Sequence, residues 1–277
     1  IAKKLVLKIK ARRVYKAFNK PTNVEYNMVA IGAGSAGLVT SYISSAVKAK
    51  AAIIEKEAMG GDCLNTGCVP SKALIKSAKV YHQVNSAHNY GVNVKESSLD
   101  FAKAMERVQN VIKKIEPHDS VERYTELGVD CIIGHAQIIS PWEVKVNNKI
   151  ITTENITIAT GASPFVPPIE GLKEIDYLTS NNLWKLRDLP KDLIILGAGP
   201  IGLEMAQSFN RFGSNVTVVE MNNRILKVED EDVSDEVRKI LENEGVKILT
   251  EHKAVRFTKN DDKNILFCQN DLHGANV

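Results

Sequence analysis

The sequence contains few cysteines, no long apolar run and no short repeat. Four cysteines among 277 residues are too few for the disulfide framework of a small secreted scaffold. No apolar run approaches the ~20 residues that cross a bilayer. Charges interrupt the apolar residues at the start of the chain, unlike in a cleavable signal peptide. With 44% hydrophobic and 25% charged residues, the composition is that of a soluble globular protein.

Acidic residues are missing from the first twenty positions, which hold eight basic residues: Lys3, Lys4, Lys8, Lys10, Arg12, Arg13, Lys16 and Lys20. The whole chain has a formal charge of only +3, so the remainder is net acidic, which argues against a nucleic-acid partner. Residues 1–25 are predicted to be either a solvated, frayed helix or a segment beside a membrane, because Lys and Arg cluster on the cytoplasmic side of membrane spans and attract anionic lipid.

The chain starts with Ile rather than Met, so we expect it to begin inside a longer protein. A membrane domain could precede the basic segment in that protein. We therefore predict a cytoplasmic location, or attachment to the cytoplasmic face of a membrane.

A first glycine motif, Gly32-Ala-Gly34-Ser-Ala-Gly37, stands between an apolar strand-like run and a helical pattern predicted over 35–47. Its three glycines allow a tight turn, close approach of the backbone to a pyrophosphate, and close packing of helix on strand. Glu55 ends the next strand-like run, 23 residues after Gly32, where a carboxylate can accept the ribose hydroxyls of an adenosine. The motif in this context predicts a dinucleotide site.

The segment Gly60-Gly-Asp-Cys63-Leu-Asn-Thr-Gly-Cys68-Val-Pro-Ser-Lys72 holds two of the cysteines with four residues between them. A helix that begins near Cys68 leaves Cys63 on the preceding loop, close enough for a disulfide, and the helix dipole favours a thiolate at its N-terminus. The alternatives are a structural disulfide, half of a zinc site, or two inert thiols. A second ligand pair for zinc is lacking at suitable spacing, and a structural disulfide is unusual without a secretory signal.

This segment closely resembles the redox motif of the class I pyridine-nucleotide–disulfide oxidoreductases, which include dihydrolipoamide dehydrogenase and mercuric reductase. The resemblance extends from about Tyr26 over nearly the whole remaining chain. It implies that Cys63 is the thiol that attacks the substrate and that Cys68 is the thiol facing a flavin. It also implies that Lys72, one helical turn after Cys68, lies near the flavin and pairs with Glu204.

The same resemblance implies a set of contacts to FAD beyond Gly32, Gly34, Gly37 and Glu55. Ala159-Thr160-Gly161 matches a turn beside FAD, and the segment Gly134-His135-Ala136 matches a backbone contact to the adenine. His135 itself is expected to be structural. The remaining predicted contacts are Ser35, Ala36, Lys56, Gly61, Asp62 and Lys72.

A second glycine motif, Gly197-Ala-Gly199-Pro200-Ile201-Gly202, again follows a strand-like run and precedes a predicted helix over 200–211. Glu220 ends the next run, again 23 residues after the first glycine. A carboxylate there suits the ribose of NAD and repels the 2′-phosphate of NADP. NAD is therefore predicted over NADP, with Arg224 as the one residue that argues for NADP. By the resemblance, Val255 contacts the nucleotide through its backbone.

The predicted fold is α/β, with two Rossmann-like three-layer domains. Residues 1–25 form the basic segment, residues 26–168 a FAD-binding domain with the cysteine pair, and residues 169–277 an NAD(P)-binding domain. Family members continue with a Gly-Asp motif that completes the FAD domain and with a dimerisation domain that carries a His–Glu pair. Neither motif is found here, so the FAD domain is expected to be incomplete, the dimerisation domain absent, and the chain nearly inactive by itself. The full-length protein is expected to be a homodimer.

The predicted function is electron transfer between NAD(P)H, FAD and the Cys63–Cys68 disulfide, acting on a small disulfide or dithiol such as lipoamide, or on mercuric ion. No resident metal is predicted. A non-catalytic nucleotide-binding remnant, or a membrane-tethered fragment of such an enzyme, is the alternative.

Overall fold

The computed structural model of the protein describes residues 15–260 and 263–270. The first six of the eight N-terminal basic residues therefore lie outside the described residues. The chain divides into two compact units, Ile1–Cys68 with Ile112–Ser163, and Val69–Val111 with Pro164–Val277. Among the described residues, no helix combines the length and the apolar character needed to span a membrane.

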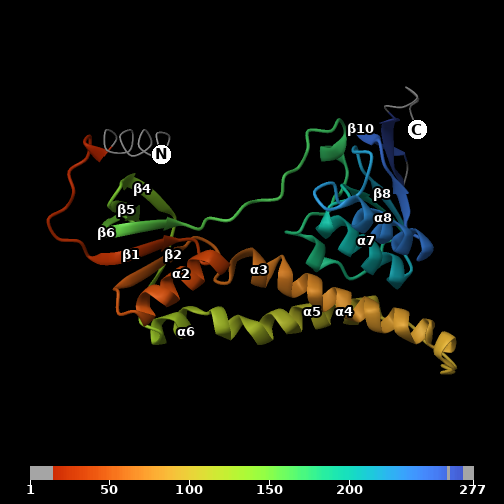
Figure 1. Cartoon of the computed structure of the whole chain (residues 1–277), viewed down its shortest axis with the longest axis horizontal. Helices are drawn as coiled ribbons and strands as arrows, with labels where there is room; N and C mark the ends of the chain where they lie inside the picture. Colours follow the sequence, from red (N-terminus) through yellow and green to blue (C-terminus); the bar gives the residue numbers. More distant parts are fainter. Residues whose placement is uncertain (1–14, 261–262, 271–277) are drawn as a thin grey trace. The chain divides into compact units, whose positions relative to one another are not determined.

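The first unit contains a six-stranded sheet (Figure 1). In spatial order its strands are β3 (Val129–Ile133), β2 (Ala51–Glu55), β1 (Tyr26–Ile31), β6 (Lys149–Ile158), β5 (Glu143–Val146) and β4 (Ala136–Ser140). The first four are parallel neighbours, whereas β6, β5 and β4 form an antiparallel meander. Every residue of β2 is buried, as expected for a strand inside a parallel sheet.

Helix α2 (Ser35–Ala46) packs against β1 and β2 and confirms the helix predicted after the first glycine motif. The sequence pattern also predicts one helical stretch over 101–126, and this prediction is wrong. Helix α5 (Phe101–Ile115) ends before a short 3₁₀ turn, Glu116–Asp119. Ser120 then caps α6 (Val121–Glu126) by accepting the N–H of Arg123 at 3.2 Å. Pro117 fits the start of a new turn, where a missing N–H costs nothing.

The second unit combines long helices with a smaller parallel sheet. Its sheet has the order β7 (Asp192–Leu196), β8 (Asn215–Val219) and β9 (Lys247–Leu249). Its helices are α4 (Cys68–Asn85, grouped with this unit from Val69 on), α5 as far as Val111, α7 (Pro200–Phe212) and α8 (Glu231–Asn243). Strands β10 (His252–Asn260) and β11 (Lys263–Asn270) pair with each other.

Residues 69–111 belong to this second unit, although the sequence groups them with residues 26–168. Aromatic packing is one physical reason. The ring of Phe101 lies 6.0 Å from that of Phe209 and 5.8 Å from that of Phe212, between ring centres. The functional assignment of the two predicted domains stays a prediction.

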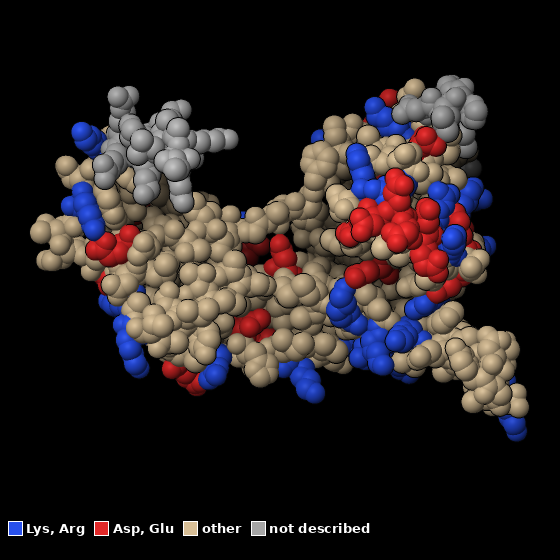
Figure 2. Space-filling view, in the orientation of Figure 1, with Lys and Arg blue, Asp and Glu red and all other residues tan. Residues whose placement is uncertain are grey.

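Acidic side chains gather on the second unit (Figure 2). Glu231 and Asp232 occupy the first turn of α8, where negative charge stabilises the positive end of the helix dipole. At the other end of α8, Glu244 accepts hydrogen bonds from both Nε (2.7 Å) and Nη2 (2.6 Å) of Arg211 in α7. Because both side chains are largely buried, this bidentate pair fixes the end of α8 against α7.

Two sets of contacts hold the described part of the basic N-terminal segment to the first unit. The ring of Tyr15 lies 5.9 Å from that of Trp142, between ring centres, and Nζ of Lys20 lies 2.6 Å from Oε2 of Glu154. Both members of the ion pair are exposed, so its contribution to stability is small.

We expect Gly37→Ala to destabilise the first unit strongly. An added Cβ would overlap the carbonyl oxygen of Gly32, and overpacking of this kind costs at least ~1–3 kcal/mol. Gly34→Ala is the matched control, since its Cβ would meet only the Cα of Gly61, at 3.8 Å. Thermal unfolding followed by circular dichroism measures both variants. Equal melting temperatures would contradict this packing.

Candidate functional site

The first glycine turn is closed by hydrogen bonds from the end of β2. The N–H of Gly32 donates to the carbonyl of Ile54 at 2.8 Å, and the N–H of Ala33 donates to Oε2 of Glu55 at 2.7 Å. Oε1 of Glu55 accepts the N–H of Glu57 at 2.8 Å. Because each carboxylate oxygen has two lone pairs, Glu55 can hold the turn and still accept a ribose hydroxyl.

The second glycine turn repeats this arrangement group for group. The N–H of Gly197 donates to the carbonyl of Val219 at 2.8 Å, and the N–H of Ala198 donates to Oε2 of Glu220 at 2.8 Å. Oε1 of Glu220 accepts the N–H of Asn222 at 2.8 Å and also its side-chain amide. The repeat seen in the sequence is therefore a repeat of the same local structure.

The middle glycine of each motif has room for an added Cβ. A Cβ at Gly199 would meet no atom within 4 Å, and one at Gly34 would meet only Gly61. A Cβ at Gly37 or Gly202, by contrast, would overlap the carbonyl oxygen of the first glycine in its own motif. The accessible backbone at the start of α2 and of α7 is what a pyrophosphate needs. The residues present therefore fit a dinucleotide in each unit.

The segment Ala159–Gly161 contacts the first glycine turn. The N–H of Ala159 donates to the carbonyl of Ile31 at 2.8 Å, and a Cβ at Gly32 would overlap the carbonyl oxygen of Ala159. A Cβ at Gly161 would lie 3.5 Å from Oδ2 of Asp62. Three separate parts of the first unit thus meet at this turn.

The segment Gly134–Ala136 lies at the end of β2, where the N–H of Gly134 donates to the carbonyl of Glu55 at 2.8 Å. His135 is exposed and Ala136 half-buried. The side chain of Lys56 is exposed and pairs with Glu57 at 3.1 Å. The exposed residues of the predicted FAD contacts also include Ser35, Ala36, Asp62, Thr160 and Gly161.

The two cysteines of the redox motif are not joined in a disulfide, and their side chains contact each other. Cys63 lies in the short helix α3 (Gly61–Asn65), and Cys68 begins α4. The pKa of the Cys63 thiol is raised, first by its hydrogen bond to Cys68 and then by burial, while a hydrogen bond with Ser35 acts in the opposite direction. Two adjacent thiols of this kind can be oxidised to a disulfide.

Lys72 and Glu204 are brought together within the second unit. Nζ of Lys72 lies 2.6 Å from Oε1 of Glu204. The side chains are 60% and 37% exposed, so the pair adds little to stability. The position of Lys72 near a flavin, which the resemblance implies, stays a prediction.

A β-bulge marks the position of Val255. Ala254 pairs with Cys268 and Arg256 with Phe267, so the register of β10 and β11 skips Val255. A bulge frees backbone groups from the ladder, which suits the predicted backbone contact. At the start of α7, Ile201 is 74% exposed.

The similarity of this chain to known proteins agrees with this arrangement. Residues 26–273 match the family description "Pyridine nucleotide-disulphide oxidoreductase". The chain belongs to the pyridine nucleotide-disulphide oxidoreductase family. It is 38% identical over 248 residues to a dihydrolipoyl dehydrogenase of Acholeplasma laidlawii, covering 88% of this chain and 73% of that protein.

Other relatives in the family are considerably longer than this chain. A mercuric reductase of Bacillus cereus is 33% identical over 239 residues, which cover 86% of this chain and 38% of that protein. The solved structure of the HOCl-induced flavoprotein disulfide reductase RclA from Escherichia coli superposes with a TM-score of 0.75 at 30% identity. That match covers 91% of this chain and 54% of the solved chain.

Asn147 supports the backbone at Ile133 and Gly134, and the sequence reasoning missed it. Asn147 and Asn148 both have positive φ and form the two-residue turn between β5 and β6, a typical hairpin connection. Nδ2 of Asn147 donates to the carbonyl of Ile133 at 2.6 Å, and the side chain fills the space where a Cβ at Gly134 would lie. The signal was an Asn-Asn pair between two strand-like runs.

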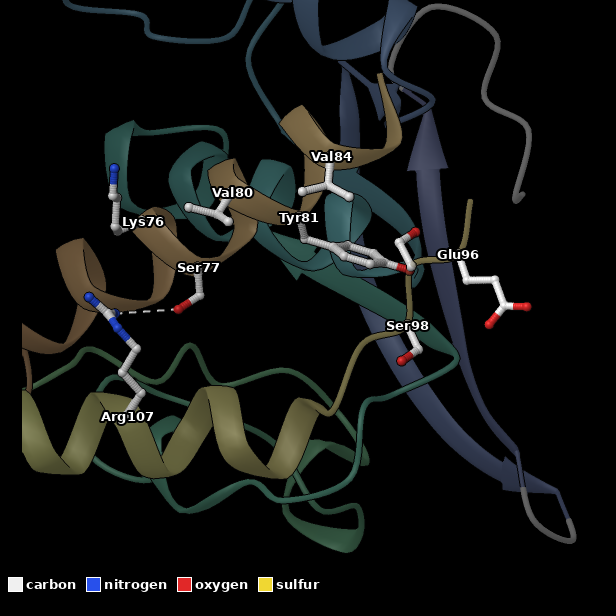
Figure 3. A pocket seen from close by; sticks show the side chains of 9 residues that line it. Lys76, Ser77, Val80, Tyr81, Val84, Glu96, Ser98 and Arg107 are labelled. Atoms are coloured by element: carbon white, nitrogen blue, oxygen red, sulfur yellow. Dashed lines mark hydrogen bonds between the residues drawn. The ribbon is translucent and has the colours of Figure 1, made fainter. Parts of the chain in front are cut away.

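A groove of about 580 Å³ lies beside α4 in the second unit. Lys76, Tyr81 and Arg107 are among the side chains that line it (Figure 3). The guanidinium of Arg107 donates to the carbonyl of Ala73 at 2.8 Å. None of the predicted site residues lines this groove. Within the described ranges, no cluster of His, Cys, Asp and Glu could hold a metal ion.

We expect Cys68→Ala to lower the pKa of Cys63, because the substitution removes the hydrogen bond that raises it most. At a pH below the pKa of Cys63 in the parent chain, a larger fraction of Cys63 is then thiolate in the variant, and its alkylation by iodoacetamide is faster than in the parent chain. The measurement is the rate of Cys63 alkylation against pH, with the site located by mass spectrometry, in the reduced parent chain and the variant. Cys131→Ala, in β3, is the control and should leave the profile unchanged. If the midpoint of the alkylation rate against pH is unchanged or higher in Cys68→Ala, the prediction is contradicted.

Proposed function

We propose that this oxidoreductase passes two electrons between a nicotinamide dinucleotide, FAD and the Cys63–Cys68 pair, and through Cys63 to a small disulfide or dithiol such as lipoamide. One observation carries the proposal. The contacting cysteines belong to the same unit as a glycine turn that fits a dinucleotide. FAD, when bound, would supply the two-electron relay between nicotinamide and disulfide.

The thiol chemistry needs only the two cysteines and a source of protons. The thiolate of Cys63 attacks one sulfur of the substrate disulfide, so a new S–S bond forms and the other substrate sulfur leaves and takes a proton. Cys68 then attacks Sγ of Cys63, which releases the second substrate thiol and closes the Cys63–Cys68 disulfide. The substrate gains two electrons and the cysteine pair loses two. Oxidation of a dithiol is the same sequence in reverse.

We expect steady-state turnover by these 277 residues alone to be slow. Within the described part of the chain, Cys68 and Ser35 are the side chains that set the protonation of Cys63, and no histidine is among them. Lack of a general acid–base typically costs ~10² to 10⁴ in rate. The function is therefore tested through single steps, namely attack by Cys63 and nucleotide binding.

We predict that Cys68→Ala, exposed to oxidised lipoamide and then quenched with iodoacetamide, shows a mixed disulfide between Cys63 and lipoamide, because the protein thiol that would resolve it is missing and alkylation stops the second lipoamide thiol from re-closing its ring. Intact-mass spectrometry measures the adduct, and Cys63→Ala is the matched control that should form none. In the parent chain Cys68 completes the exchange, so the adduct is absent and about two thiols are lost together. Absence of an adduct in Cys68→Ala would favour the alternative, a nucleotide-binding remnant without thiol chemistry.

Mercuric ion is the second candidate substrate, supported by the similarity to the mercuric reductase of Bacillus cereus. Two contacting thiols can bind a thiophilic metal ion together. Competition in the trapping experiment separates the candidates. If mercuric ion at equimolar amounts protects Cys63 from alkylation by iodoacetamide, while lipoamide forms no adduct, the mercuric-reductase-like assignment is favoured.

The predicted preference for NAD is supported by the surroundings of Glu220. Its buried carboxylate would oppose a 2′-phosphate. Arg224, the residue that argued for NADP, is engaged within its own loop. Its Nη1 donates to the carbonyl of Glu229 at 2.9 Å and its Nη2 to that of Lys227 at 3.0 Å.

We expect the parent chain to bind NADH more tightly than NADPH, by about tenfold. Glu220→Gln should bring the two dissociation constants closer together. Gln keeps an acceptor for Ala198 but removes the charge. Glu55→Gln makes the equivalent change in the first glycine motif and should leave the ratio unchanged. Isothermal titration calorimetry measures both ligands. Equal or tighter NADPH binding by the parent chain would overturn the preference.

The predicted assembly rests on the resemblance, and the predicted location rests on the basic N-terminal segment. A homodimeric full-length protein, attachment to a membrane through a preceding domain, and a cytoplasmic location all stay predictions.

A further inference from the structure

The two glycine turns differ in how many donors the carboxylate at the end of the neighbouring strand accepts. Within the described residues, Glu55 accepts two N–H groups, from Ala33 at 2.7 Å and from Glu57 at 2.8 Å. A carboxylate can accept about four hydrogen bonds, so each oxygen of Glu55 keeps one free acceptor position. Glu55 can therefore accept both hydroxyls of an adenosine ribose.

Glu220 accepts a third donor. Its Oε2 accepts the N–H of Ala198 at 2.8 Å and its Oε1 the N–H of Asn222 at 2.8 Å, as at the first turn. The side-chain amide of Asn222 also donates to Oε1. The matching residue of the first unit is Glu57, whose carboxylate pairs with Lys56 at 3.1 Å instead. Both acceptor positions on Oε1 of Glu220 are therefore filled, and one position remains on Oε2.

Lys227 determines which end of the Asn222 amide faces Glu220. Nζ of Lys227 lies 2.9 Å from Oδ1 of Asn222. An ammonium group can only donate and a carboxylate can only accept. Oδ1 of Asn222 must therefore face Lys227, and Nδ2 must face Glu220.

Backbone hydrogen bonds hold this loop independently of the Asn222 side chain. The N–H of Leu226 donates to the carbonyl of Ala198 at 2.9 Å, and the N–H of Glu251 donates to the carbonyl of Asn222 at 2.9 Å. The backbone N–H of Asn222 also keeps its bond to Glu220 when the side chain is changed. Removal of the amide should therefore leave the carboxylate in place with one more free acceptor position.

We propose that Asn222 restricts Glu220 to one hydroxyl of the adenosine ribose, because its amide fills the acceptor position that a second hydroxyl would otherwise use. The inference rests on the proposed function, since it concerns the same NAD site. Removal of the amide should then tighten NAD binding. A purely structural role of Asn222 predicts the opposite sign, since a loosened loop would bind NAD less well.

The test compares NAD binding by the parent chain, Asn222→Leu and Asn222→Ala. Isothermal titration calorimetry measures the dissociation constants, with FAD added to occupy the first glycine turn. Leu has nearly the shape of Asn but cannot form a hydrogen bond. We expect both variants to bind NAD about threefold to tenfold more tightly, which is the effect of one additional hydrogen bond. Asn223→Leu changes the neighbouring exposed amide and should leave the dissociation constant unchanged.

NAD analogues that lack the 2′- or the 3′-hydroxyl of the adenosine ribose provide a second readout. In the parent chain one of the two should bind about as tightly as NAD, whereas in Asn222→Leu both should bind more weakly than NAD. Circular dichroism shows that the variants are folded.

Unchanged or weaker NAD binding by folded Asn222→Leu and Asn222→Ala would overturn the inference. Equal losses of affinity for the two analogues in the parent chain would also overturn it. Those results would leave the preference of the parent chain for NADH over NADPH and the lipoamide adduct intact, so the inference and the proposed function fail separately.

Discussion

A carboxylate at the end of one strand holds each glycine turn at the end of the neighbouring strand. Glu55 and Glu220 are each only 8% exposed, and a buried carboxylate is costly unless it is hydrogen-bonded. Backbone N–H groups satisfy both, at Ala33 in the first unit and at Ala198 in the second. The turn therefore cannot move without leaving a buried charge unsatisfied, and the helix that follows it is fixed in direction.

The steric constraint on the glycines acts together with this carboxylate. Gly37 and Gly202 let each helix approach the first residue of its own turn, where a Cβ would overlap a carbonyl oxygen. In the first unit Gly61 adds a second close approach, which brings the thiol segment to the turn. The same local structure therefore serves two purposes, since only the first copy is combined with a cysteine pair. The second copy is followed instead by a hairpin with a bulge at Val255.

Much of this could be predicted from local patterns. The spacing of 23 residues from the first glycine to Glu55 and to Glu220 indicated two strand–turn–helix–strand units, because strand, turn and helix each have a sequence period or a punctuating residue. The boundaries of α2 and α7 were predicted to within one residue. The break between α5 and α6 was missed, since helical periodicity continues across Pro117, which stands at the start of a new turn rather than inside a helix.

The sequence by itself determined the two glycine turns, the cysteine pair and the residue types around them, because each depends on neighbours within about one turn or one strand. Tertiary structure alone decided which distant groups meet. It brought Gly61 onto Gly34, and Ala159 against Gly32. It also placed Phe101 against Phe209, so that residues 69–111 belong to the second unit. These contacts join residues far apart in the chain, and their choice follows from how buried surfaces fit, which no local period encodes.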